Sequence, residues 1–201
     1  MFCFTKPSKK SILQIIEAQR HLPFSYTEIG ATNHSLPAGY TIDHNRIRLG
    51  SGEAVFNAAV AALRNWKMFD IGWVKLCFPD TPIEVGATVA VLAGHFGFWS
   101  LHPARIVYLV DEETAEARRF GFAYGTLPAH GERGEERFLI EWRRDDDSVW
   151  YDLLAFSQPK ALLAKLGYPL SRMLQRRFAR ASKQAMLRAA REEVVGKQSA
   201  V

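Results

Sequence analysis

The segment FAYGTLPAHGERGEERF, residues 122–138, holds the densest group of side chains that could do chemistry in this 201-residue chain. It joins a run of aromatic residues to a turn rich in Pro and Gly, and its candidate residues for chemistry are Tyr124, His130, Glu132, Glu135 and Glu136. At the mouth of a cavity, Tyr124 and His130 could contact a ligand. The competing interpretation is a hairpin with Tyr124 packed in the core and the acids solvated, and we favour it for His130 and the glutamates. For Tyr124 the two interpretations are balanced, because a buried phenol needs a hydrogen-bond partner.

A second candidate is Asp152, which interrupts the apolar strand VWYDLLAF. A carboxylate in a half-buried strand usually pairs with a cation, and Arg46 and Arg105 are the candidate partners. If Asp152 lines a cavity instead, desolvation raises its pKa and makes it a candidate general acid.

Three histidines, His44, His95 and His102, are further candidates. His95 and His102 could meet across a hairpin. The three show neither HxH nor HExxH spacing, so they are a weak zinc signal and we predict no metal site. Cys3 and Cys77 are far apart and have no CxxC partner, which indicates two reduced thiols.

The sequence contains no signature of a nucleophilic enzyme or a nucleotide site. GxSxG and P-loop motifs are absent. Gly50-Ser51-Gly52 follows a predicted strand, but that strand is polar and the sixth position of the dinucleotide fingerprint is Val55. We interpret this segment as a capped strand-to-helix turn and predict no cofactor.

The elements that must position these residues follow from hydrophobic periodicity. We predict an N-terminal helix over 8–20 and a second helix after Gly52. The predicted strands are 41–50, 73–78, 86–99, 104–110, 118–126, 136–143 and 148–157. Short links between successive strands require antiparallel neighbours. After Pro159 we predict a short helix over 160–166, a long helix over 169–193 and a frayed tail over 194–201.

Alternation within the strands shows what the sheet faces. In RRFGFAYGT, Phe120, Phe122 and Tyr124 share one face, and small residues occupy the other. Small residues in a row let another backbone or a ligand approach closely. The long C-terminal helix has one apolar stripe, Leu166, Leu170, Met173, Leu174, Phe178, Ala181, Ala185 and Ala189, which must lie across the sheet. We therefore predict that Tyr124 faces an interior space shared with that helix.

Composition places the chain among ordinary globular proteins, with 48% hydrophobic and 23% charged residues, and we expect one domain over 1–201. A secretory signal and a membrane span are both missing from the sequence, so we expect a cytoplasmic protein. Much of the net charge of +5 lies on the C-terminal helix, including Arg176, Arg180 and Lys183. A solvated helix face explains this charge. An anionic lipid surface is an alternative partner, whereas nucleic acid is disfavoured because no aromatic platform accompanies the basic residues.

The order of the elements resembles the helix-grip fold of START domains and pollen allergens, an α+β fold in which an antiparallel sheet of six to seven strands curls around a long C-terminal helix. Several runs, YTEIGAT (26–32), LPAGY (36–40), RIVYLVDE (105–112), FGFAYGTLPAHGERGEERF (120–138) and AFSQPKALLAKLG (155–167), resemble uncharacterised protein family 0548 of bacteria and plants. The resemblance covers about 24–193. It implies a cavity between sheet and helix, and it supplies no catalytic residues.

The leading hypothesis is a protein that holds a small apolar or amphipathic molecule between the sheet and the C-terminal helix. The candidate ligand-binding residues are Trp99, Tyr108, Phe122, Tyr124, His130, Tyr151, Asp152 and Phe178. The alternative for the aromatic residues is that they simply fill the core. An enzyme of the cyclase or hydrolase type, using Tyr124, Asp152 or His95 in the same cavity, is a second hypothesis. A third is an interaction module that works through the basic helix face.

Overall fold

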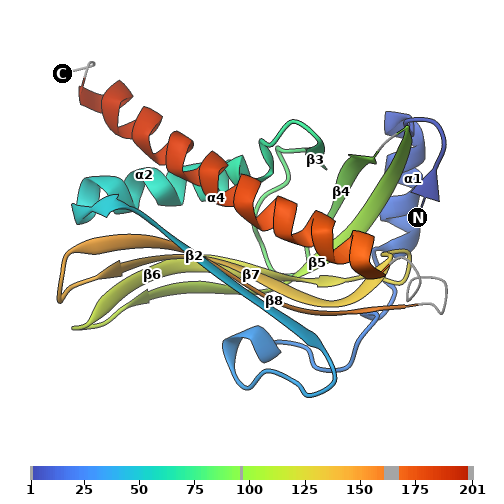
Figure 1. The fold of residues 1–201 in the computed structure, drawn as a ribbon, viewed down its shortest axis with the longest axis horizontal. Helices are drawn as coiled ribbons and strands as arrows, with labels where there is room; N and C mark the ends of the chain where they lie inside the picture. The colour runs from blue at the N-terminus through green and yellow to red at the C-terminus, as the bar shows by residue number, and fades with distance from the viewer. Residues whose placement is uncertain (1, 96, 161–167, 199–201) are drawn as a thin grey trace.

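The computed structural model describes residues 2–95, 97–160 and 168–198 (Figure 1). Its helices are α1 (Lys9–Gln19), α2 (Gly52–Arg64) and α4 (Tyr168–Gln198), with short 3-10 helices η1 (Ala31–Asn33) and η2 (Lys67–Phe69). Its strands are β1 (Phe2–Cys3), β2 (Thr41–Ser51), β3 (Val74–Cys77), β4 (Thr88–His95), β5 (Phe98–Glu113), β6 (Ala117–Thr126), β7 (Glu132–Arg143) and β8 (Ser148–Pro159).

The strands form one antiparallel sheet in the order β2-β8-β7-β6-β5-β4-β3, and β1 pairs with β5. Strands β3 to β8 follow each other as a meander, and β2 closes the far edge by pairing with β8. The sheet is curved, and α4 runs across its concave side (Figure 1). This confirms the predicted α+β fold, an antiparallel sheet curled around a long C-terminal helix.

Strand β5 differs from its prediction. The stretch 86–99, predicted as one strand, contains β4, a turn and the beginning of β5. Gly97 in that turn has a φ of 93°, a conformation that suits glycine. The aromatic residues on both sides of Gly97 favour a strand, so the sequence pattern did not indicate the turn. Strand β5 then continues to Glu113 and carries a bulge between Ile106 and Tyr108, which reverses the face toward which its later side chains point.

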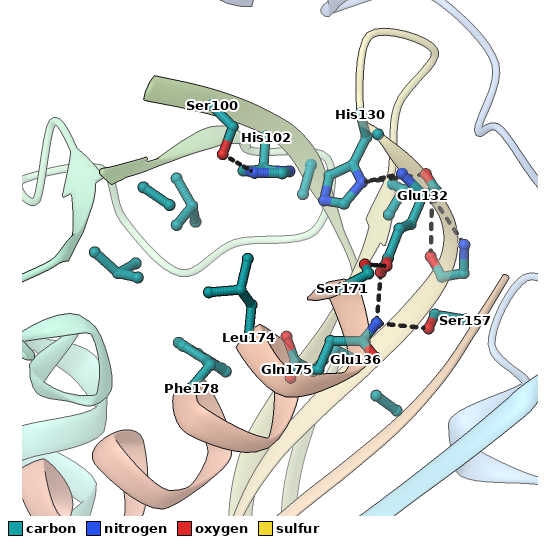
Figure 2. Close-up of a pocket in the computed structure, with 18 of the residues that line it drawn as sticks. Ser100, His102, His130, Glu132, Glu136, Ser157, Ser171, Leu174, Gln175 and Phe178 are labelled. Carbon is teal, nitrogen blue, oxygen red and sulfur yellow. Dashed lines mark hydrogen bonds between the residues drawn. The ribbon is translucent and has the colours of Figure 1, made fainter. Parts of the chain in front are cut away.

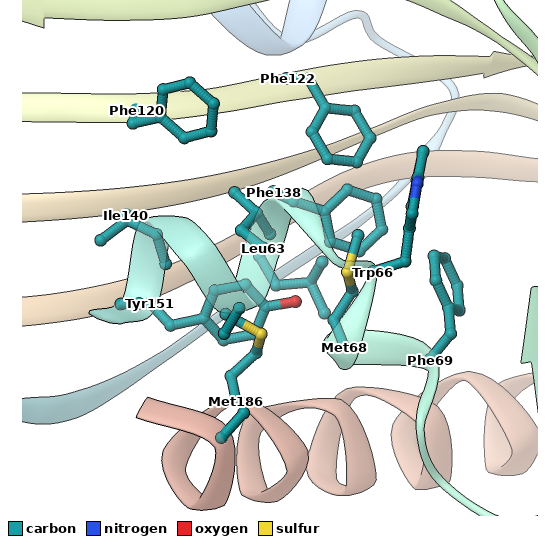
Figure 3. Close-up of a cluster of buried hydrophobic side chains, with 14 of the residues drawn as sticks. Leu63, Trp66, Met68, Phe69, Phe120, Phe122, Phe138, Ile140, Tyr151 and Met186 are labelled. Atoms are coloured by element: carbon teal, nitrogen blue, oxygen red, sulfur yellow. The ribbon is translucent and has the colours of Figure 1, made fainter. Parts of the chain in front are cut away.

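One half of the concave face is filled by a packed core (Figure 3). Phe122 meets the Trp66 ring edge-on at 5.1 Å between ring centroids and lies 5.2 Å from Phe138. Tyr151 is fully buried, and its hydroxyl lies 2.9 Å from Ser182 Oγ on α4. Helix α2 is therefore sandwiched between this part of the sheet and the second half of α4 (Figure 1).

The buried stripe of α4 is shifted from its predicted position. Ala185 and Ala189 are buried as predicted, together with Ala179, Ser182, Met186 and Ala190. Near the beginning of the helix Leu170 and Met173 are 43% and 46% exposed, because α2 does not reach this end of the sheet. The helix continues to Gln198, beyond its predicted end. Leu166 and the short helix predicted over 160–166 fall on 161–167, outside the described residues.

The convex face carries the N-terminal elements. Ile12 and Ile16 of α1 pack on Ala90, Leu92 and Leu101, as expected for an amphipathic helix capped by Ser8. Cys3 and Cys77 are free thiols, as predicted. Over the described ranges, each helix is too short or too polar to cross a lipid bilayer.

Candidate functional site

A cavity of about 1190 Å³ lies between the concave face of the sheet and the first half of α4. The strand residues that line it include Ala93, Ala104 and Ala155. Helix α2 does not cover that end of the sheet (Figure 1). The apolar wall of the cavity includes Phe69, Trp73, Val91, Leu153, Leu174 and Phe178. Its volume is slightly above the roughly 300–1,000 Å³ that is common for ligand pockets.

The sequence leaves this half of the sheet unfilled because its inward side chains are small. Ala93, Ala104, Thr126, Ala155 and Ser157 line the cavity on four different strands. Further along the same strands, the inward positions carry large side chains such as Phe122 and Tyr151. The concave face therefore changes from large to small side chains along each strand, and the space below α4 opens where they become small.

Tyr124 and Glu136 form the polar pair at the centre of the cavity. They face each other across β6 and β7, and the Tyr124 hydroxyl donates a 2.7 Å hydrogen bond to Glu136 Oε2. Burial raises the pKa of Glu136 to about 7, and the nearby carboxylates of Glu132 and Asp43 act in the same direction, while the Tyr124 bond opposes them. Burial and the charge of Glu136 hold the pKa of Tyr124 well above its usual value. Tyr124 is therefore a donor, and Glu136 can gain or lose a proton near neutral pH.

A second polar group consists of histidines at the β4–β5 side (Figure 2). His95 Nε2 and His102 Nε2 each lie 2.7 Å from Ser100 Oγ, and the rings of His102 and His130 are 4.7 Å apart. Burial lowers the pKa of His102 to about 3 and that of His130 well below 6.5. Both imidazoles are therefore neutral at pH 7. Since the Ser100 hydroxyl has one hydrogen, it donates to one imidazole and accepts from the other.

Helix α4 closes the cavity through hydrogen bonds to the sheet (Figure 2). Glu132 accepts from the Ser171 hydroxyl at 2.6 Å and from the Gln175 amide at 2.7 Å. The same amide lies 3.1 Å from Ser157 Oγ. Arg172 forms a two-pronged ion pair with Asp43 on β2, with Nη2 2.6 Å from Oδ1. These contacts hold the first turns of α4 against β2, β7 and β8.

The predicted ligand-binding residues separate into three places. Tyr124, His130 and Phe178 line the cavity. Phe122 and Tyr151 point to the concave side but are buried in the packed core. Trp99, Tyr108 and Asp152 do not line the cavity. Trp99 packs beside the α1 cluster, and the Tyr108 hydroxyl bonds Thr32 Oγ1 at 2.7 Å.

Asp152 is part of an ion-pair network on the convex face. Its carboxylate binds His44 Nε2 at 2.7 Å, Arg137 Nη2 at 3.0 Å and Arg46 Nε at 3.1 Å. This confirms the predicted pairing with Arg46. Arg105 instead donates to backbone carbonyls at the end of α1. The alternative of Asp152 as a general acid in the cavity is wrong, because alternation places it on the opposite face from Tyr151.

The expectation of solvated acids in the 130–136 turn is also wrong. Glu135 is 2% exposed and accepts four hydrogen bonds, from the Tyr26 hydroxyl, the Gly30 and Thr32 amides and the Thr32 hydroxyl. It fixes the 24–34 segment to the convex face. Gly125 leaves the space for this contact, since a Cβ there would lie 2.2 Å from the Tyr26 hydroxyl oxygen. The small residues of β6 thus admit a neighbouring loop.

Sequence reasoning missed the roles of Glu132, Glu136, His102 and Gln175. A signal for Glu136 was present, because it shares the parity of Phe138 and Ile140 on β7 and so had to point inward. The histidines are divided by the sheet. His44 lies on the convex face, whereas His95 and His102 meet through Ser100 as the hairpin prediction required.

The basic residues of α4 lie outside the polar centre of the cavity. Arg176 and Arg180 are exposed, and Lys183 is half-buried with Nζ 3.4 Å from Asn45 Oδ1. Arg176 stands at the edge of the cavity. Arg172, on the same helix, forms an ion pair with Asp43.

Comparison with solved structures finds Ara h 8.0201 and human STARD10. Ara h 8.0201 is 13% identical, with a TM-score of 0.44 over 74% of this chain and 99% of that chain. Human STARD10 is 10% identical, with a TM-score of 0.44 over 97% of this chain and 84% of that chain. At these values the likeness concerns the fold alone.

Sequence comparison is more specific. A UPF0548 protein of Dictyostelium discoideum is 42% identical over 94% of this chain and 95% of its own length. A UPF0548 protein of Deinococcus radiodurans is 38% identical over 94% of this chain and 99% of its own length. The domain of unknown function DUF1990 matches residues 25–185. As the sequence motifs indicated, the chain belongs to this DUF1990 and UPF0548 family.

Proposed function

We propose that this protein binds a small amphipathic molecule in the cavity between the sheet and α4. The cavity itself carries the proposal: about 1190 Å³ with an apolar wall and a localised set of polar side chains. Ligand sites commonly combine a mostly apolar surface with a few placed polar groups. The alternative that the aromatic residues only fill the core holds for Phe122 and Tyr151, but Tyr124 and Phe178 face open space.

The chemical division of the wall supports an amphipathic ligand. Leu153, Leu174 and Phe178 offer apolar contact, whereas Tyr124, Glu136 and His102 offer hydrogen bonds in the same cavity. A purely apolar ligand would leave Glu136 Oε1, which has no hydrogen-bond partner among the described residues, in a desolvated place. A purely polar one would leave the apolar wall unused.

A cavity-filling variant tests the proposal. Ala155 lines the cavity opposite Glu136, so Ala155→Trp places an indole in the binding space. Val85→Trp adds the same indole at a site that is 63% exposed and outside the cavity, and serves as the control. We expect the uncharged dye Nile red to bind the wild type and the Val85 variant with a fluorescence increase that saturates, and to bind Ala155→Trp at least about tenfold more weakly. Equal binding by all three proteins would contradict the proposal.

A second candidate function is acid–base catalysis on the bound molecule. The observation that favours it is Glu136, whose pKa of about 7 makes both protonation states available near neutral pH, beside the Tyr124 donor. Native mass spectrometry of the wild type and Glu136→Gln, each purified from the same cells, separates the two functions. If the protein only binds, Glu136→Gln retains either the molecule found in the wild type or none, and no molecule of a new mass. An enzyme that needs Glu136 leaves substrate in the variant, with a mass that the wild type does not show.

A further inference from the structure

The carboxylates of this protein differ in how they are neutralised. Asp152 has Arg46 and Arg137 besides His44, Glu141 has Arg46 and Arg119, and Asp43 has Arg172. A buried carboxylate normally needs such partners or several hydrogen-bond donors, because losing water is costly for a charge.

Among the described carboxylates that line the cavity, Glu136 has the fewest polar partners. Within the described residues, its side chain has one polar partner, the Tyr124 hydroxyl on Oε2. Its Oε1 has no hydrogen-bond partner in that part of the chain. Glu132 lines the same cavity, and its side-chain partners, Ser171 and Gln175, are neutral. Among the described residues, three carboxylates that line the cavity, Glu132, Glu135 and Glu136, therefore have no cation among their own contacts. Glu135 is already satisfied by four neutral donors, which leaves Glu132 and Glu136.

Among the described residues, the other polar groups of the cavity form no ion pair with Glu136 or Glu132. The pKa of His102 and that of His130 are lowered by burial, so both rings are neutral. Lys160 Nζ is occupied by the Leu127 and Pro128 carbonyls. Arg176 is exposed at the edge of the cavity.

From this arrangement we infer that the ligand is an amphipathic organic cation, such as an amine or quaternary ammonium with an apolar body, whose charge lies beside Glu136 and Glu132. This inference rests on the proposed function. The wall supplies a second element of cation recognition, since Tyr124, Phe69 and Phe178 present aromatic rings to the same space. An anion beside Glu136 and Glu132 would be repelled by their two carboxylates. A neutral ligand would leave the charge of Glu136 uncompensated above its pKa.

Three probes with the same ten-carbon chain test the charge preference by isothermal titration at pH 8, below their micellar concentrations. The probes are decyltrimethylammonium, decanol and decanoate. We expect the cation to bind at least about tenfold more tightly than decanol, and decanoate to bind most weakly. Between pH 8 and pH 6 the affinity for the cation should fall by about tenfold, because protons then compete for Glu136.

Glu136→Gln provides the matched variant. It should abolish both the cation preference and the pH dependence, while the affinity for decanol stays within about twofold. Glu84→Gln, which removes an exposed carboxylate outside the cavity, should leave both unchanged. Tyr124→Phe keeps the carboxylate and should keep the cation preference.

The outcomes separate the inference from the proposed function. Equal binding of the three probes, or tightest binding of decanol or decanoate, would overturn the cation inference and leave a binding cavity in place. A cation preference that survives in Glu136→Gln would also overturn it. If no probe binds and Nile red does not bind either, the proposed function falls together with the inference.

Discussion

Glu136→Gln should make the protein more stable at alkaline pH. The amide keeps the size of the side chain and an oxygen that can accept the Tyr124 hydrogen bond, but it cannot ionise. In the native protein the pKa of Glu136 is raised to about 7 from an ordinary 4.5. Between these values the folded state holds a proton that the unfolded state has released. The contribution of Glu136 to the free energy of unfolding is therefore fully present below about pH 4.5 and is lost as the pH rises to about 7.

The pKa difference sets the size of the effect. At about 1.36 kcal/mol per pKa unit it corresponds to at most about 3 kcal/mol, and the part of Glu136 that is open to the cavity reduces this. We expect the variant and the wild type to differ little near pH 4.5. At pH 8 the variant should be more stable by roughly 1–3 kcal/mol.

Urea denaturation at pH 5, 6, 7 and 8, followed by tryptophan fluorescence, measures this difference. The histidines of the cavity also titrate in acid, but they are present in both proteins and cancel in the comparison. Glu84→Gln, at an exposed carboxylate, should track the wild type at every pH. Parallel curves for Glu136→Gln and the wild type, or a variant that is less stable at pH 8, would refute a desolvated Glu136.

Three further predictions concern the same elements. Tyr124→Phe removes the only side-chain hydrogen bond that Glu136 forms among the described residues. It should lower the free energy of unfolding, measured by urea denaturation, by on the order of 1 kcal/mol, and by more at pH 8 than at pH 5. An unchanged urea midpoint would contradict the Tyr124–Glu136 pair. The pKa of His102 is lowered to about 3, so its contribution to stability is present above about pH 6.5 and lost as the pH falls. His102→Gln should therefore reduce the loss of unfolding free energy between pH 7 and pH 5 by up to about 2 kcal/mol. An unchanged loss would show that His102 is not desolvated. Replacing Arg176, Arg180 and Lys183 together by Gln should change stability within about ±0.5 kcal/mol for each residue, and a loss of several kcal/mol would contradict a solvated helix face.

Much of the fold was predictable because the strands alternate regularly. The alternation of β6 places Tyr124 with Phe120 and Phe122, and the structure buries all three. Tyr108 was not predictable in this way, because the β5 bulge reverses the alternation and no residue type marks a bulge by itself.

The cavity was harder to locate than the fold. The resemblance to helix-grip proteins implied a space between sheet and helix, but its position depends on where α2 ends and where inward residues become small. Ala104 and Thr126 become neighbours through the β5–β6 register, as Glu136 and Ala155 do through the β7–β8 register. These pairings join residues that are far apart in the sequence, so the sequence pattern of one strand does not reveal them. Asp152 was misplaced as a cavity candidate for the same reason: its partners His44 and Arg46 reach it through the pairing of β2 with β8.

The central claim is that the space between sheet and α4 holds the ligand, and intermolecular nuclear Overhauser effects test it most directly. The protein, labelled at its Leu and Val methyl groups, is saturated with unlabelled decyltrimethylammonium. Val91, Leu153 and Leu174 line the cavity, whereas Leu139 and Leu154 point to the opposite face of the sheet. We predict cross-peaks from the decyl chain to the first three residues and none to Leu139 or Leu154. Cross-peaks to the convex-face leucines alone, or a saturated complex without contacts to the cavity methyls, would contradict the account.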